Sequence, residues 1–213
     1  MVVMRKPGFV RVFCILIEKI RAIAIGARMS DNHETVIAAT REWVEKAVIG
    51  LNLCPFAKSV YVKNQVRIQV SEAANPQQLA EELAAELKLL ADTDPQEIDT
   101  TLLVHPNTLA RFLDFNEFLD IADAIVEDLG LDGVIQVASF HPKFQFDGTG
   151  VNDIDNYTNR SPYPTLHLIR EASIDRAVEA FPEAEAIYER NIETLQTLGL
   201  AGWKAMFAPK PSE

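Results

Sequence analysis

Residues 133–171, GVIQVASFHPKFQFDGTGVNDIDNYTNRSPYPTLHLIRE, decide the fold of this chain. An apolar run ends at a His-Pro pair and a second apolar run ends the stretch, which predicts two strands joined by a loop over 141–164. Loops of that length are usually functional or disordered. The aromatic residues and prolines of this loop argue against disorder. We therefore expect an ordered loop that forms part of a site.

In the sequence on either side of this stretch, segments with the apolar pattern of amphipathic helices alternate with short apolar segments typical of strands. This order predicts the fold class α/β, with α+β as the second choice. We expect one mixed, largely parallel sheet of four to five strands with helices packed on it. The segment 59–70 is either one strand or a hairpin that turns at Lys63 and Asn64. The expected helices are 31–50 with Asp31 as cap and Gly50 as end, 75–94 with Asn75 as cap, 114–130 with an Asp114–Glu117 capping box, about 173–181, and 182–198.

Two histidines each follow a predicted strand and precede a proline: His105 and His141. Parallel strands end on one edge of a sheet, which is where open α/β folds bind ligands. If the fourth strand returns antiparallel, His167 comes within two residues of the same edge. Either His105 or His141 could act as a general base, and a hairpin at 59–70 would bring Cys54 beside them as a nucleophile. Otherwise Cys54 is a buried residue that anchors its turn.

The loop is dense in hydrogen-bonding groups. Arginine binds carboxylate and phosphate groups in a bidentate manner, so Arg160 and Arg170 are candidates for holding an anionic ligand. The alternative is that both arginines pair with Asp153, Asp155 or Glu171 and hold the loop in place. The predicted ligand-binding residues are His167, Asn156, Tyr157, Asn159, Arg160 and Arg170.

The chain has 213 residues, of which 48% are hydrophobic, and a net charge of −11. Residues 1–28 hold six basic residues and one acidic residue, so the remainder is near −16. A surface this acidic repels phosphate backbones, so we expect no nucleic-acid partner. Two cysteines without framework spacing indicate a reducing, cytoplasmic compartment.

Residues 1–28 are too short and too charged for stable membrane insertion. They could form a peripheral membrane-binding helix, an organelle presequence, or a translated upstream stretch with the true start at Met29. We favour the last, which leaves 29–213 as a single globular domain.

Four stretches together carry a family resemblance: VIAATREWVEKAVIGLNLCPFAK, LLVHP, SFHPKFQF and NYTNRSPYPTLHLIRE. With them the chain resembles an uncharacterised bacterial family, the domain of unknown function number 1415. The resemblance covers about residues 33–205 and leaves 1–28 outside. It implies a whole-domain unit, and it implies nothing about chemistry.

Two hypotheses of function remain. The first is a small-molecule enzyme with a histidine-lined site under the loop and an anionic substrate. In a metal-dependent form of this hypothesis, zinc or iron is bound by His105, His141 and His167, with or without Cys54. The second is a non-catalytic binding or regulatory module that uses the same loop. The sequence names no cofactor.

Overall fold

The computed structural model describes residues 32–180 and 186–208. The predicted cap Asp31 and the segment 1–28 lie outside these residues. Within them no helix combines the length and the apolar character that crossing a membrane requires.

A four-stranded mixed sheet forms the centre of the described chain, in the order β1-β2-β4-β3. β1 and β2 are parallel, whereas β4 is antiparallel to both β2 and β3. β1, β2 and β3 therefore run in the same direction, as predicted, but the expectation of a largely parallel sheet was wrong because β4 lies between two of them. The strands are β1 (Val66–Val70), β2 (Thr100–Val104), β3 (Ile135–Phe140) and β4 (Thr165–Arg170).

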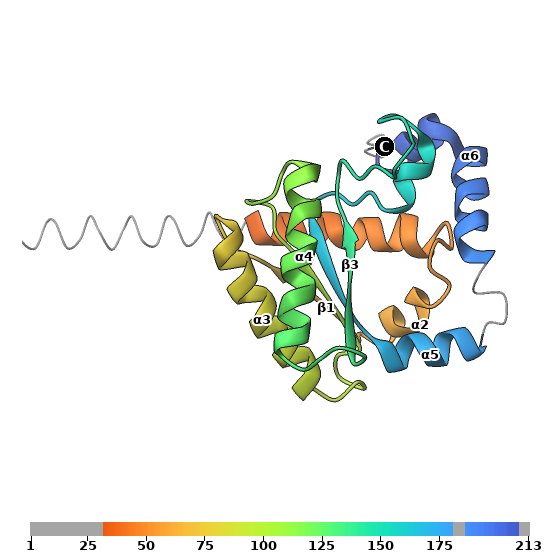
Figure 1. The fold of residues 1–213 in the computed structure, drawn as a ribbon. Coiled ribbons are helices and arrows are strands. Elements are labelled where there is room, and N and C mark those ends of the chain that lie inside the picture. The colour runs from red at the N-terminus through yellow and green to blue at the C-terminus, as the bar shows by residue number, and fades with distance from the viewer. Residues whose placement is uncertain (1–31, 181–185, 209–213) are drawn as a thin grey trace, which may run out of the picture.

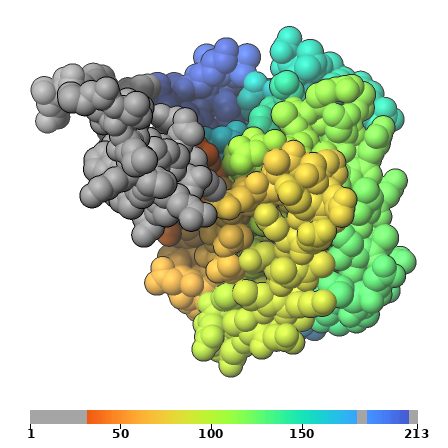
Figure 2. All heavy atoms as spheres, turned by 90° about the vertical axis from the view of Figure 1, so that its left-hand side faces the viewer, coloured from red at the N-terminus to blue at the C-terminus, as the bar shows by residue number. Residues whose placement is uncertain are grey.

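Helices α3 (Pro76–Asp92) and α4 (Phe112–Asp128) cover one face of the sheet (Figure 1). In Figure 2 α3, in yellow, lies at the surface on the side turned to the viewer. Asn75 caps α3 as predicted, because its side chain accepts a hydrogen bond from the N–H of Gln78 at 3.0 Å. Buried leucines of α3 and phenylalanines of α4 pack on the strands: Leu79, Leu83, Leu87, Leu90, Phe115 and Phe118.

The predicted capping box of α4 was wrong. The helix begins at Phe112, so Asp114 lies inside the first turn and makes no cap hydrogen bond. The ring of Phe112 packs against the rings of His141 and Phe144, with centroids 5.5 and 5.1 Å apart. The helix therefore starts two residues before the predicted cap, at a residue whose side chain is packed against the loop.

The other face of the sheet packs against a helix over 32–43 that continues as the π-helix η1 (Val44–Ile49). The N–H of Gly50 bonds to the carbonyl of Glu45 at 2.9 Å, five residues back, and ends this helix as predicted. Helix α6 (Ile187–Met206) also packs here through Leu195. Gly199 interrupts α6 with φ of 64°, one residue past the predicted end at 198.

Residues 59–62 form neither a strand nor half of a hairpin, so both predictions were wrong. They belong to helix α2 (Ala57–Val62). Asn64 follows with φ of 57°; its N–H bonds to the carbonyl of Tyr61 and that of Gln65 to Val60, both at 3.0 Å. This is a Schellman cap, which needs the same left-handed residue as a hairpin turn. The β-branched and aromatic residues Val60 and Tyr61 therefore lie in a helix despite their strand preference.

The chain closes with α5 (Glu171–Ala180), close to the predicted 173–181, and with α6. The loop over 141–164 contains one 3₁₀ turn, η2 (Ile154–Thr158), which packs beside α6.

Candidate functional site

His105 and His141 directly follow β2 and β3, at the edge where those strands end. Each backbone N–H bonds to a carbonyl of the long loop: His105 to Pro164 at 3.0 Å and His141 to Asn159 at 3.1 Å. The returning loop is thus fixed to the ends of both strands. Both histidines are fully buried.

The two histidine rings bind neighbouring carbonyls of one turn between β2 and α4. Nδ1 of His105 lies 3.3 Å from the oxygen of Thr108, and Nε2 of His141 lies 3.1 Å from the oxygen of Leu109. The N–H of Lys143 donates to Nδ1 of His141 at 3.0 Å, so His141 is neutral and donates through Nε2. Leu109 has φ of 55°, a conformation that costs a leucine roughly 1–2 kcal/mol. The histidines therefore stabilise a strained turn.

The ring of Phe115 lies against both histidine rings, with centroids 5.6 Å from His105 and 5.1 Å from His141. Burial in these surroundings lowers the pKa of His105 to about 4, and it also lowers the pKa of His141. Within the described part of the chain Nε2 of His105 has no hydrogen-bond partner. Neither histidine lines either of the two cavities described below.

The structure does not bring His167 to the other two histidines. His167 pairs with Leu102 and Ala138 in the middle of the sheet. Its Nε2 lies 2.7 Å from the hydroxyl of Thr100, on the opposite face from α3 and α4, and burial lowers its pKa to about 4. No group of three histidine, cysteine or acidic side chains among residues 32–180 and 186–208 is arranged to hold a metal ion.

Arg170 also lies away from the histidines. It ends β4 opposite Ile135, the first residue of β3, and hence at the far edge of the sheet. Its guanidinium is buried and donates to the carbonyls of Leu90, Thr93 and Ile98. Arg170 therefore closes the end of α3, at the edge of the sheet opposite His105 and His141.

Cys54 lies in the turn between η1 and α2, where its N–H bonds to the carbonyl of Val48 at 3.3 Å. Burial raises the pKa of its thiol, which opposes formation of the thiolate that a nucleophile needs. α2 leads into the start of β1, at the edge opposite His105 and His141.

Asn156 and Asn159 hold the loop together. The buried side chain of Asn156 accepts from the N–H of Phe146 at 2.9 Å and from the hydroxyl of Thr149 at 2.8 Å, and it donates to the carbonyl of Gly150 at 2.8 Å. The side-chain amide of Asn159 donates to the carbonyl of Ser139 at 3.4 Å.

Tyr157 and Arg160 face a cavity of about 320 Å³, which we call the loop groove. Nε and Nη2 of Arg160 donate to the carbonyls of Phe144 and Val151 at 3.1 and 2.7 Å, and its guanidinium carbon lies 4.4 Å from the centroid of the Tyr157 ring. The groove lies between the loop, the first helix and the end of α6. Its lining is Ala39, Glu42, Trp43, Pro142, Tyr157, Arg160, Ser161, Pro162, Trp203 and Phe207.

Three of the four aromatic rings of the loop groove form a chain of contacts. The ring of Trp203 lies 5.2 Å from that of Tyr157 and 5.4 Å from that of Phe207. Lys46 joins the first helix to α6, because its ammonium donates to Glu42 at 2.6 Å and to the carbonyl of Met206 at 2.7 Å. The negative charge of Glu42 is thus paired.

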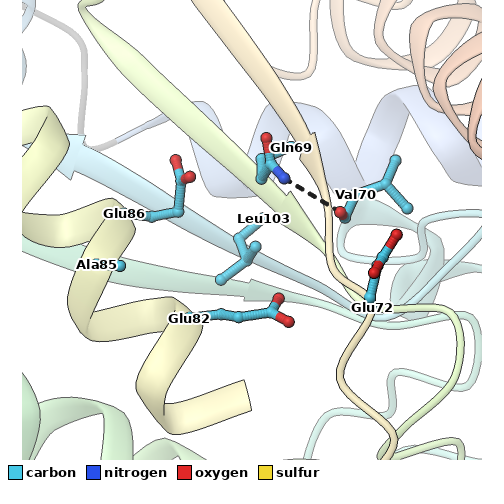
Figure 3. Close-up of a pocket in the computed structure, with 7 residues that line it drawn as sticks. All are labelled: Gln69, Val70, Glu72, Glu82, Ala85, Glu86 and Leu103. Atoms are coloured by element: carbon cyan, nitrogen blue, oxygen red, sulfur yellow. Dashed lines mark hydrogen bonds between the residues drawn. The ribbon is translucent and has the colours of Figure 1, made fainter. Parts of the chain in front are cut away.

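A second cavity, of about 280 Å³, lies between β1 and α3 (Figure 3). The figure shows the side chains of Glu82 and Glu86 projecting from α3 and that of Glu72 from the segment after β1. Glu86 is paired with Arg67 at 2.8 and 3.0 Å. Val70, which lines this cavity, pairs with Val104, the residue before His105, but no histidine and no residue of the loop over 141–164 lines it.

Comparison of the sequence with protein-family models identifies the family of this chain. The family described as "Protein of unknown function (DUF1415)" matches residues 35–205. The chain belongs to this family. The match confirms the resemblance drawn from the four stretches and includes the described loop, both buried histidines and all but one residue of the loop groove, Phe207. Comparisons with curated proteins and with solved structures gave no significant match.

In this DUF1415 protein the sequence pointed to Tyr157 and Arg160 but missed the rest of the groove. Trp43 was predicted only as an apolar position of the first helix, and Trp203 lies beyond the last predicted helix, which ended at 198. One feature of the sequence could have drawn attention to these two positions, because they are the only two tryptophans of the chain.

Proposed function

We propose that this protein is a non-catalytic binding module whose ligand site is the loop groove. One observation carries the proposal: the loop that the buried histidines hold in place forms one wall of a cavity with four aromatic side chains in its lining, and the first helix and α6 form the other walls. Ligand sites are typically concave and apolar, with a few polar groups that fix orientation. A rigid loop on a packed scaffold is suited to this task.

The histidines support binding better than catalysis. A general base works best with a pKa near the operating pH, whereas the pKa of His105 is about 4 and both ring nitrogens of His141 are engaged with the backbone. The only ring nitrogen of the pair without a partner in the described residues, Nε2 of His105, is buried. Both histidines act as supports of the site, and the ligand does not contact them.

The test uses the two tryptophans, because both line the loop groove. A library of small carboxylates, phosphates, amines and neutral aromatics is screened by thermal shift, and hits are titrated by tryptophan fluorescence. A ligand at about 100 times its Kd stabilises the fold by about 2.7 kcal/mol. The proposal expects a hit whose binding is lost in Trp203→Leu and kept in the control Tyr188→Leu, an exposed aromatic on the same helix.

Two results would overturn the proposal. One is a hit that binds Trp203→Leu as tightly as the original chain. The other is turnover of any library compound that disappears in a folded His105→Gln variant, because that would make the buried ring catalytic.

A further inference from the structure

We infer that the ligand of the loop groove is a planar aromatic molecule with a carboxylate group, bound with its ring among the tryptophans and its carboxylate on Arg160. This inference rests on the proposed function and names the ligand class for that site. Four aromatic side chains and two prolines line the groove, against one guanidinium and one carboxylate. Aromatic rings favour offset or edge-to-face contact with other rings, and this preference selects a flat, unsaturated ligand over an aliphatic one.

The size of the cavity limits the ligand to one or two rings. At about 320 Å³ the groove is at the lower end of the range for ligand pockets, which is roughly 300–1,000 Å³. A peptide helix or a dinucleotide would extend well outside it.

Arg160 fixes the place of the charged group. Two carbonyls hold its Nε and Nη2, and Tyr157 packs against its guanidinium, so its position is set before a ligand arrives. These two bonds use Nε and Nη2, so we assign the carboxylate of the ligand to Nη1. An arginine already held in position loses little side-chain entropy on binding a carboxylate.

A cationic ligand is the main alternative, because aromatic cages recognise ammonium groups. The groove already holds its own cations against two of its rings: Arg160 over Tyr157, and the Lys46 ammonium 5.8 Å from the centroid of Phe207. The carboxylate of Glu42 is paired with Lys46. A further cation would meet repulsion and find no unpaired carboxylate, whereas an anion meets Arg160.

The experiment compares four probes by isothermal titration calorimetry on the full chain: 2-naphthoate, cyclohexanecarboxylate, 2-naphthylmethanol and phenyltrimethylammonium. The inference expects 2-naphthoate to bind at least about tenfold more tightly than each of the other three, a margin of about 1.4 kcal/mol. Arg160→Lys removes the planar fork and should weaken 2-naphthoate about tenfold while leaving 2-naphthylmethanol unchanged. The matched control Arg176→Lys, on α5 near Asp99, should change neither.

The outcomes separate the inference from the proposed function. If cyclohexanecarboxylate or phenyltrimethylammonium binds as tightly as 2-naphthoate and Trp203→Leu abolishes it, the ligand class is wrong and the groove remains the binding site. If none of the four probes binds but the library screen gives a groove ligand, the ligand class is again wrong. If neither experiment gives a ligand, both the class and the proposed function are wrong. The comparison among probes uses the unmodified chain, so it holds even where Arg160→Lys disturbs the loop.

Discussion

Acidification should destabilise the fold through its buried histidines, and His105 gives the clearest case. Burial lowers its pKa from 6.5 to about 4 in the folded chain. Between these values the unfolded chain binds a proton that the folded chain does not bind, so stability falls as the pH falls. The contribution is complete above the unfolded pKa and is lost progressively as the pH falls towards 4.

The expected loss follows from these two pKa values. Going from about pH 7 to about pH 5.5, one such histidine costs about 1.2 kcal/mol of the free energy of unfolding. His167, whose pKa is also about 4, adds a similar amount, and the lowered pKa of His141 acts in the same direction. Protonation of the acidic surface opposes this loss, because the net charge of −11 becomes smaller. The informative quantity is therefore the difference between the original chain and a variant.

Urea denaturation followed by tryptophan fluorescence at the two pH values measures this difference. The variant His105→Gln removes the titrating ring and should reduce the loss of stability by about 1.2 kcal/mol. His33→Gln is the control, because it removes a histidine at the surface that contacts Glu72 and has no part in the buried turn. If His105→Gln and His33→Gln lose the same stability on acidification as the original chain, the reasoning is refuted.

Three further predictions concern side chains that hold the fold. His141→Ala should destabilise the chain by about 2–5 kcal/mol, since it opens a cavity and leaves the buried carbonyl of Leu109 and the partly buried N–H of Lys143 without the histidine ring. Urea denaturation measures this, and a loss below about 1 kcal/mol would contradict it. Arg170→Met should lower the free energy of unfolding by about 2–4 kcal/mol and raise the rate of hydrogen exchange at the end of α3, while ligand binding in the loop groove remains. Loss of ligand binding in a folded variant would contradict this and argue that Arg170 contacts the ligand. Asn156→Ala should loosen the loop, so that limited proteolysis cuts within 141–164 before it cuts elsewhere; an unchanged cleavage pattern would exclude the proposed role of its three hydrogen bonds.

The sequence predicted those features that depend on neighbouring residues or on general topology. The cap at Asn75 is a local pattern, and the shared edge of His105 and His141 follows from strands that alternate with helices. The Schellman cap at Asn64 was missed because hairpin turns and helix ends both use a left-handed asparagine.

The loop groove was predicted only on its loop side. Trp43 and Trp203 line one cavity because the first helix and α6 pack on the same face of the sheet, and no pattern within either helix contains that information. His105 and His141 lie at the predicted edge and His167 does not, and the burial of the first two depends on α4 beginning early enough to place Phe112 and Phe115 over them.

The π-helical turn η1 has a consequence for how this helix can vary in length. A π-turn holds one residue more than an α-helical turn, as the bond from the N–H of Gly50 to the carbonyl of Glu45 shows. Deleting one residue within 44–49 would convert the π-helical turn to an α-helical one. The side chains of Trp43 and Leu53 would still point towards the core. The same deletion within α3 or α4 would rotate the rest of the helix by about 100° and expose its buried side chains. Related chains with a one-residue gap in this helix should therefore still fold.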